Sequence, residues 1–218
     1  WQEEVARLEE KVSSLKERLD EERDAFGKMG TNNYKVFQVD SNEMTYLGNN
    51  VCMEGDVNKD GFNDVIISSF SWNNDTGRVF FFYGGKDLDF SSPDMIFSGE
   101  KEGDSFGNQS GTFGDLNRDG YDDVVIGVPG HTWNSTNDGY INIYYGGPDM
   151  DSRPDVVLKG QADSKEHLGL RVTTADIDND GYPDILAGAQ GYDNLRGRVY
   201  LFWGGEPFDT IPDVVYEG

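Results

Sequence analysis

Asp56-Val57-Asn58-Lys59-Asp60-Gly61-Phe62-Asn63-Asp64 is a nine-residue stretch that occurs three times in this 218-residue chain. It returns as Asp115-Leu116-Asn117-Arg118-Asp119-Gly120-Tyr121-Asp122-Asp123 and as Asp176-Ile177-Asp178-Asn179-Asp180-Gly181-Tyr182-Pro183-Asp184. In each copy, oxygen-bearing side chains occupy positions 1, 3, 5 and 9, and glycine at position 6 permits a sharp turn. Oxygen ligands at this spacing suit a hard cation such as Ca²⁺. The repeat therefore predicts three calcium-binding loops.

The pattern departs from an EF-hand at its end. An EF-hand has a bidentate glutamate at position 12, whereas these copies have Ile67, Ile126 and Ala187, within short apolar runs typical of strands. We therefore expect a calcium loop between two strands. Turns rich in Asp, Asn and Gly also form without metal, but three copies with oxygens at the same positions favour the metal. The expected ligands are the side chains of Asp56, Asn58, Asp60, Asp64, Asp115, Asn117, Asp119, Asp123, Asp176, Asp178, Asp180 and Asp184, with the backbone carbonyls of Phe62, Tyr121 and Tyr182.

The composition is strongly acidic, with 41 Asp and Glu against 18 Lys and Arg and a formal charge of −23. This charge argues against nucleic acid and anionic membranes as partners. No apolar run is long enough to insert into a membrane. Cys52 is the only cysteine, so an intrachain disulfide is excluded and stability must come from core packing and metal.

Residues 1–28 differ from the rest of the chain and predict an amphipathic, coiled-coil-like α-helix. Its apolar heptad positions are Val5, Leu8, Val12, Leu15, Leu19 and Phe26. A parallel in-register homodimer would place like charges opposite one another, such as Glu4 and Glu9, and is disfavoured. An antiparallel pair, a different partner helix, docking on the chain's own body and a stalk without a specific partner remain open. Residues 29–33 predict a flexible linker.

The remaining sequence repeats with a period near sixty residues, because the acidic loops start at 56, 115 and 176. Aromatic strand-like segments follow at 78–85, 140–147 and 198–205, and Pro-Asp segments close the units at 93–97, 154–158 and 212–216. We expect an all-β fold of three four-stranded antiparallel blades, at about 44–98, 104–159 and 166–217. Residues 34–39 predict one extra strand.

Phe106-Gly107, the loop from Asp115 to Asp123, and Gly127-Val128-Pro129 together resemble the FG-GAP repeat of integrin α-subunit propellers. The resemblance covers residues 34–218. It implies a β-propeller with Ca²⁺ in the loops between strands 1 and 2, and with ligands bound on the opposite face by the 4–1 and 2–3 loops. Such propellers usually close with seven blades. Three blades imply a piece of a longer propeller, several chains that complete a ring or stack, or an open end capped by the N-terminal helix.

Large aromatic residues recur in the expected 2–3 loops, namely Trp72, Trp133 and Tyr192. They could form a recognition surface for protein or glycan, or they could cap the hairpins beneath them. Three sites, Asn74, Asn108 and Asn134, match the N-glycosylation pattern and weakly favour a secretory route.

Signals for catalysis are few, because neither of the two histidines, His131 and His167, stands near a nucleophile in sequence. We expect a non-enzymatic, calcium-binding adhesion or recognition module that is extracellular or at the cell surface. Its partners would be an adhesion ligand or like subunits. One alternative is a structural subunit whose blades stack or complete a ring or filament between chains. Another, less favoured, is an accessory propeller of an enzyme.

Overall fold

The computed structural model describes residues 45–109, 111–130, 138–205 and 208–218. The expected helix of residues 1–28, the linker of residues 29–33 and the extra strand of residues 34–39 lie outside the described residues. So do Trp133, Asn134 and His131.

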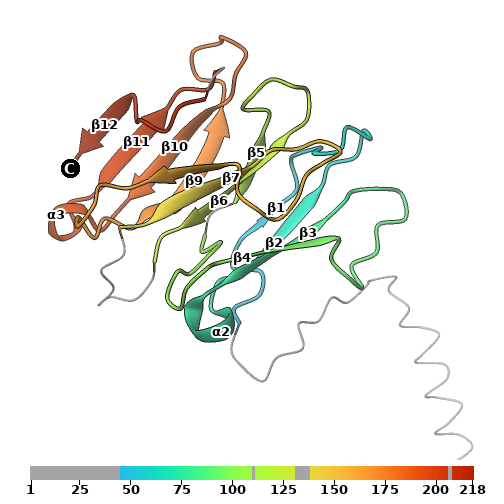
Figure 1. Ribbon diagram of the computed structural model, residues 1–218, viewed down its shortest axis with the longest axis horizontal. Coiled ribbons are helices and arrows are strands. Elements are labelled where there is room, and N and C mark those ends of the chain that lie inside the picture. Colours follow the sequence, from blue (N-terminus) through green and yellow to red (C-terminus); the bar gives the residue numbers. More distant parts are fainter. Residues whose placement is uncertain (1–44, 110, 131–137, 206–207) are drawn as a thin grey trace, which may run out of the picture. The chain divides into compact units, whose positions relative to one another are not determined.

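The described residues form three four-stranded antiparallel sheets, each made of consecutive strands in chain order (Figure 1). Sheet 1 contains β1 (Val51–Cys52), β2 (Val65–Ser69), β3 (Arg78–Phe82) and β4 (Met95–Ser98). Sheet 2 contains β5 (Thr112–Gly114), β6 (Asp123–Val128), β7 (Tyr140–Tyr144) and β8 (Val156–Lys159). Sheet 3 contains β9 (Leu168–Ala175), β10 (Asp184–Ala189), β11 (Arg198–Phe202) and β12 (Val214–Glu217). The expected all-β class and the three four-stranded sheets are confirmed.

The alternation of side chains along β3 shows why these segments form strands. After Arg78 its residues are β-branched or aromatic, and successive side chains point to opposite faces. Val79 and Phe81 belong to the core shared with sheet 2, whereas Phe80 and Phe82 belong to a separate cluster on the other face. Both faces of this strand are therefore buried, which explains its continuous apolar sequence.

Two cores join the three sheets. In the first, Phe81 and Phe97 of sheet 1 pack with Val124, Ile126 and Tyr144 of sheet 2. The second joins sheet 2 to sheet 3 through residues such as Ile143 and Phe202. Because each core takes side chains from two sheets about sixty residues apart, no sheet completes its core alone.

Two of the loops between strands 2 and 3 lie within the described residues, the β2–β3 loop and the β10–β11 loop. They contain the single turns α2 (Trp72–Asp75) and α3 (Tyr192–Leu195). Inside these turns Asn73, Asn74, Asp193 and Asn194 have φ between 41° and 58°. Asn and Asp adopt this left-handed conformation more readily than most residues. The loops β1–β2, β5–β6 and β9–β10 lie at the end of the sheets opposite to α2 and α3 (Figure 1).

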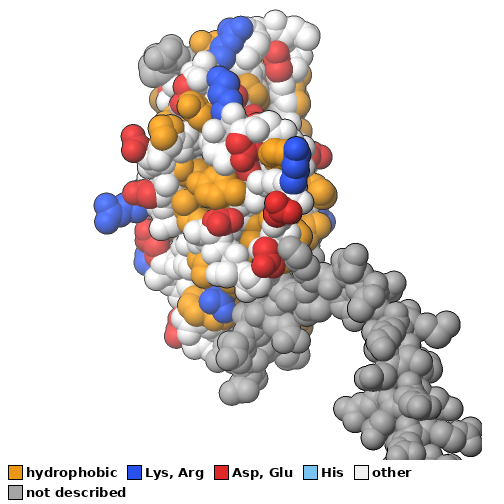
Figure 2. Space-filling model, turned by 90° about the vertical axis from the view of Figure 1, so that its right-hand side faces the viewer, with side chains coloured by type: hydrophobic (Ala, Val, Ile, Leu, Met, Phe, Trp, Pro, Cys, Tyr) orange, Lys and Arg blue, Asp and Glu red, His pale blue; other side chains and the backbone are white. Residues whose placement is uncertain are grey.

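The surface agrees with the acidic composition. On the face shown in Figure 2, Asp and Glu side chains are interspersed with exposed hydrophobic side chains. Among the described residues, no helix has the length and apolar character that a membrane crossing needs.

Candidate calcium sites

The aspartate at position 9 anchors each acidic loop. Asp64, Asp123 and Asp184 are buried, and each accepts a hydrogen bond at Oδ2 from the backbone N–H of position 2, at 2.8 Å in all three loops. Their Oδ1 atoms accept from Gly84, Gly146 and Gly204, at 2.7, 2.9 and 2.9 Å. These glycines follow the third strand of each sheet, so the position-9 carboxylate fixes the loop to its own sheet.

The remaining oxygens of each loop turn inward through short-range hydrogen bonds. The position-1 carboxylate accepts from the glycine N–H at position 6, at 2.8 Å for Asp56 and 3.0 Å for Asp115 and Asp176. The position-3 oxygen accepts from the N–H of position 5, at 3.0 to 3.1 Å. A left-handed residue at position 4 closes the turn, with φ of 58°, 60° and 62° at Lys59, Arg118 and Asn179. Three separate sequences therefore adopt one loop geometry.

The clustered carboxylates repel one another and lose solvent. Burial raises the pKa of Asp123 to about 7, the charges of Asp119 and Asp115 add to the rise, and hydrogen bonds from Gly146 and Leu116 oppose it. Burial likewise raises the pKa of Asp64 and of Asp115. A bound cation would reverse this effect, because it favours the charged carboxylates.

Two observations fit a divalent cation. Asp115 Oδ1 is buried and accepts no hydrogen bond, which leaves an oxygen available to a metal. In the third loop, one carboxylate oxygen from each of Asp176, Asp178 and Asp184 lies within 4.8 Å of the others. Such a group of oxygens suits Ca²⁺. Ligation by the individual residues, including the carbonyls of Phe62, Tyr121 and Tyr182, stays a prediction.

The aromatic residues at the opposite end contact arginines of their own sheets. The guanidinium carbon of Arg78 lies 4.2 Å from the ring centroid of Trp72, and that of Arg198 lies 3.4 Å from the ring centroid of Tyr192. Both rings are partly exposed. Each ring therefore packs on an arginine of its own sheet and stays partly exposed, and both roles expected from the sequence, recognition and capping of the hairpin, stay predictions.

The glycosylation patterns differ in accessibility. Asn74 is exposed, and its amide donates to Glu102 at 3.0 Å. Asn108 is buried, and its side-chain oxygen accepts from Asn49 at 3.0 Å. The burial of Asn108 argues against a glycan there, and sequence reasoning missed it because the pattern carries no information on burial.

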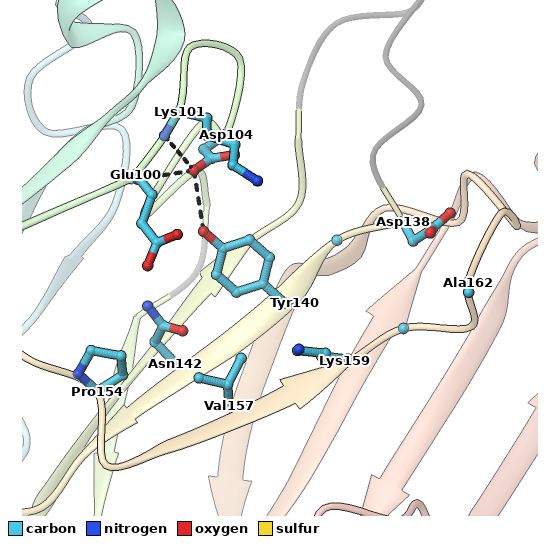
Figure 3. Close-up of a pocket in the computed structure, with 12 residues that line it drawn as sticks. Glu100, Lys101, Asp104, Asp138, Tyr140, Asn142, Pro154, Val157, Lys159 and Ala162 are labelled. Atoms are coloured by element: carbon cyan, nitrogen blue, oxygen red, sulfur yellow. Dashed lines mark hydrogen bonds between the residues drawn. The ribbon is translucent and has the colours of Figure 1, made fainter.

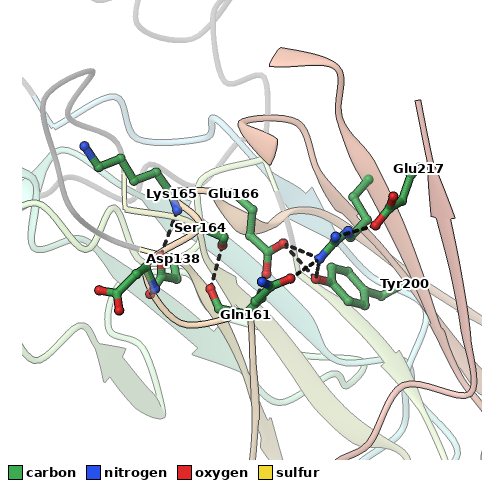
Figure 4. Close-up of polar contacts among 9 residues, drawn as sticks. Asp138, Gln161, Ser164, Lys165, Glu166, Tyr200 and Glu217 are labelled. Carbon is green, nitrogen blue, oxygen red and sulfur yellow. Dashed lines mark hydrogen bonds and ion pairs between the residues drawn. The ribbon is translucent and has the colours of Figure 1, made fainter. Parts of the chain in front are cut away.

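A buried ion pair links the β8–β9 loop, which connects sheets 2 and 3, to β11 of sheet 3 (Figure 4). Glu166 Oε2 lies 3.4 Å from Arg198 Nη1 and accepts from the hydroxyl of Tyr200 at 2.7 Å. Arg198 also donates to Gln161 Oε1 at 2.8 Å and pairs with Glu217. Burial would lower the pKa of Arg198, but hydrogen bonds to Tyr200 and Glu217 raise it overall, so the guanidinium stays charged.

The equivalent junction between sheets 1 and 2 contains a pocket of about 420 Å³ instead (Figure 3). There Tyr140 stands at the repeat position of Arg198 and donates to Asp104 at 3.1 Å. Asp104 also accepts from the backbone N–H groups of Glu100 and Lys101. Asn142 lines the pocket, is 6% exposed, and its Oδ1 has no hydrogen-bond partner.

Comparisons with known proteins identify the repeat and several relatives of the chain. The FG-GAP repeat family model matches residues 107–144 and 168–202. Integrin alpha-5 of Xenopus laevis is 32% identical over 189 residues, which cover 79% of this chain and 18% of that protein. Integrin alpha-6 of Homo sapiens is 31% identical over 202 residues, covering 91% of this chain and 16% of that protein. Phosphatidylinositol-glycan-specific phospholipase D of Bos taurus is 30% identical over 172 residues, covering 71% and 20%. The chain spans a fifth or less of the length of these relatives.

Proposed function

The chain carries FG-GAP repeats and is homologous to integrin α-subunits over most of its length, and from this premise we propose that it is a calcium-stabilised, non-enzymatic recognition module. It works outside the cell or on its surface, where calcium in the millimolar range would fill even weak sites. Its partner is a protein, either an adhesion ligand or a like subunit.

One observation carries this proposal: the same loop hydrogen bonds recur three times at one end of the three sheets, and in the third loop carboxylate oxygens of Asp176, Asp178 and Asp184 lie within 4.8 Å of one another. The position-9 aspartates are buried, and the hydrogen bonds that they accept come from backbone N–H groups, which carry no full positive charge. Burying carboxylates next to one another is costly unless a cation or hydrogen bonds offset it. Ca²⁺ would supply the missing positive charge, and the side chains at positions 1, 3, 5 and 9 would hold it.

The opposite end supports the recognition role. The Arg78 and Arg198 guanidinium groups hold the rings of Trp72 and Tyr192 against the sheets, so these rings are ordered before a partner arrives. Ordered aromatic residues contribute strongly to protein recognition because little conformational freedom is lost on binding. In this proposal the metal loops brace the sheets from one end, and the other end meets the partner.

A cell-attachment assay tests the recognition role. The full chain is immobilised in buffer with about 1 mM calcium, a concentration typical for extracellular modules, and attached cells are counted. We expect attachment to wild type and a severalfold reduction for Tyr192→Ala. Leu195→Ala is the matched control, because Leu195 lies in the same turn and is exposed. Equal attachment to all three surfaces, or none above a blank surface, would count against recognition through this end.

The self-assembling alternative is favoured by one feature of sheet 3. Leu186 and Tyr216 of sheet 3 are exposed, whereas Ile66 and Phe97, at the same repeat positions of sheet 1, are buried by sheet 2. An exposed sheet face of this kind is suited to a further sheet. Light scattering with calcium and with chelator separates the alternatives: a large species that chelator disrupts indicates assembly.

An accessory role beside an enzyme domain has the phospholipase D relative as its support.

A further inference from the structure

Asp122 lies in the second acidic loop, at position 8, yet its hydrogen bonds go to the first. Its Oδ2 accepts from the backbone N–H of Asp56 at 2.8 Å, and its own N–H donates to the carbonyl of Asp56 at 3.2 Å. Asp56 is the position-1 residue of the first loop and its first expected metal ligand. Asp122 thus forms hydrogen bonds with both the N–H and the carbonyl of Asp56.

The next residue of the first loop is held from the same side. The carbonyl of Val57 accepts from Gly147 N–H at 2.7 Å. Gly147 follows Gly146, whose N–H donates to Asp123 Oδ1 in the second loop at 2.9 Å. Val57 N–H in turn donates to Asp64. Hydrogen bonds, together with the peptide links Gly146–Gly147 and Asp122–Asp123, therefore connect the position-9 residue of the second loop with positions 1, 2 and 9 of the first.

The other two loops lack this connection at position 8. In the third loop position 8 is Pro183, which has neither a backbone N–H nor a carboxylate. The second and third loops are linked instead by an exposed hydrogen bond from Arg118 Nη1 to the carbonyl of Asp180, at 3.3 Å. In the first loop, the Asn63 amide donates to the carbonyl of Met53, in the same β1–β2 connection, at 3.1 Å. Asp122 is distinguished from both residues because it bridges two loops.

We propose that Asp122 is a positioning residue that couples calcium binding in the first and second loops, so that filling one raises the affinity of the other. The inference rests on the proposed calcium sites. Ordering the Asp56 backbone costs conformational entropy, and once the second loop is filled and rigid, Asp122 has already ordered it. The first loop then binds at a smaller cost, and by linkage the effect is reciprocal.

The test is isothermal titration of the full chain with Ca²⁺, in an Asp180→Ala background that silences the third loop. Asp119→Ala then silences the second loop and leaves the first to be measured alone. We expect the dissociation constant of the first loop to rise roughly fivefold or more when the second is silenced, a typical coupling between linked sites. The reciprocal variant, Asp60→Ala, should weaken the second loop by the same factor.

Asp122→Ala separates positioning from general damage. With the second loop intact, it should weaken the first loop about as much as silencing the second loop does, and silencing the second loop should then add less than about twofold. Asp122→Asn keeps a side-chain acceptor oxygen, which Asp122→Ala removes, and should recover most of the coupling. Asn63→Ala is the matched control at the same loop position and should retain the coupling. Circular dichroism in saturating calcium verifies that each variant is folded.

The outcomes distinguish this inference from the proposed function. If the loops bind calcium but the first loop keeps its dissociation constant when the second is silenced, the coupling is wrong and the calcium sites stand. If no loop binds calcium in any variant, both fail. Should Asp122→Ala melt below the working temperature, the Asp119→Ala and Asp122→Asn titrations decide.

Discussion

The first two acidic loops and the third have the same sequence pattern but different surroundings. At position 2, Val57 and Leu116 are 0% exposed, whereas Ile177 is 50% exposed. Val57 and Leu116 belong to the cores that join their sheets to the following one. The comparison teaches that a loop's own hydrogen bonds set its shape, whereas the next sheet supplies its burial. Stability should therefore be distributed unevenly among repeats that look alike in sequence.

Truncating equivalent side chains in sheets 1 and 3 should show the largest difference. Phe97 is 0% exposed and its ring lies 4.4 Å from that of Tyr144, whereas Tyr216, its repeat equivalent, is 64% exposed. We expect Phe97→Ala to lower the free energy of unfolding by about 3–5 kcal/mol and Tyr216→Ala by about 0.5 kcal/mol or less. Urea denaturation in saturating calcium measures both. Equal losses would mean that sheet 3 is covered in solution.

Removing the charge of Glu166 from its ion pair with Arg198 should cause the next largest loss of stability. Glu166→Gln removes the buried charge opposite Arg198 and should cost about 3 kcal/mol, because a buried guanidinium loses its buried partner. Glu217→Gln is the matched control, since the Glu217 side chain is 54% exposed and exposed pairs contribute at most about 1 kcal/mol. Thermal melts at fixed calcium compare them. A cost for Glu166→Gln no greater than the control's would show that this junction does not depend on its buried charge.

The stability of the metal-free chain should change with pH by a smaller amount. The pKa of Asp123 is about 7 in the folded chain, above its ordinary value of 3.8. The folded state therefore binds the proton more tightly than the unfolded state. The resulting stability is complete below the ordinary value and is lost as the pH rises through about 7.

In chelator, wild type should thus melt higher at about pH 5 than at about pH 8, and Asp123→Asn should reduce this difference. Calcium should reverse the trend, because it binds the deprotonated carboxylate and its affinity falls as Asp123 takes up a proton. A metal-free chain that melts at a higher temperature at about pH 8 than at about pH 5 would contradict the raised pKa of Asp123.

The sequence predicted the parts of the fold that repeat, and it missed the contacts between repeats. The acidic loops, the aromatic third strands and the Pro-Asp segments recur at fixed spacing, so three four-stranded sheets could be inferred from period and alternation alone. The pairing of Glu166 with Arg198 and the bonds of Asp122 to Asp56 depend on how sheets pack across roughly sixty residues. No local pattern reports such contacts, although Pro183 at the position of Asp122 shows where the repeat changes.

The α2 and α3 turns were also missed. Their Asn and Asp residues could have indicated them, because these residue types adopt the positive φ found there more readily than most. Burial of Asn108 was equally invisible, because it follows from the packing of sheet 1 against sheet 2. The repeat thus determined the shape of each sheet, and the differences between sheets came from their neighbours.

Equilibrium dialysis against calcium tests the central claim most directly. At about 1 mM free calcium, typical of extracellular sites, the account predicts three ions per chain, and one fewer for each of Asp60→Ala, Asp119→Ala and Asp180→Ala. Binding of less than one ion per chain, or a count that these substitutions leave unchanged, would contradict it.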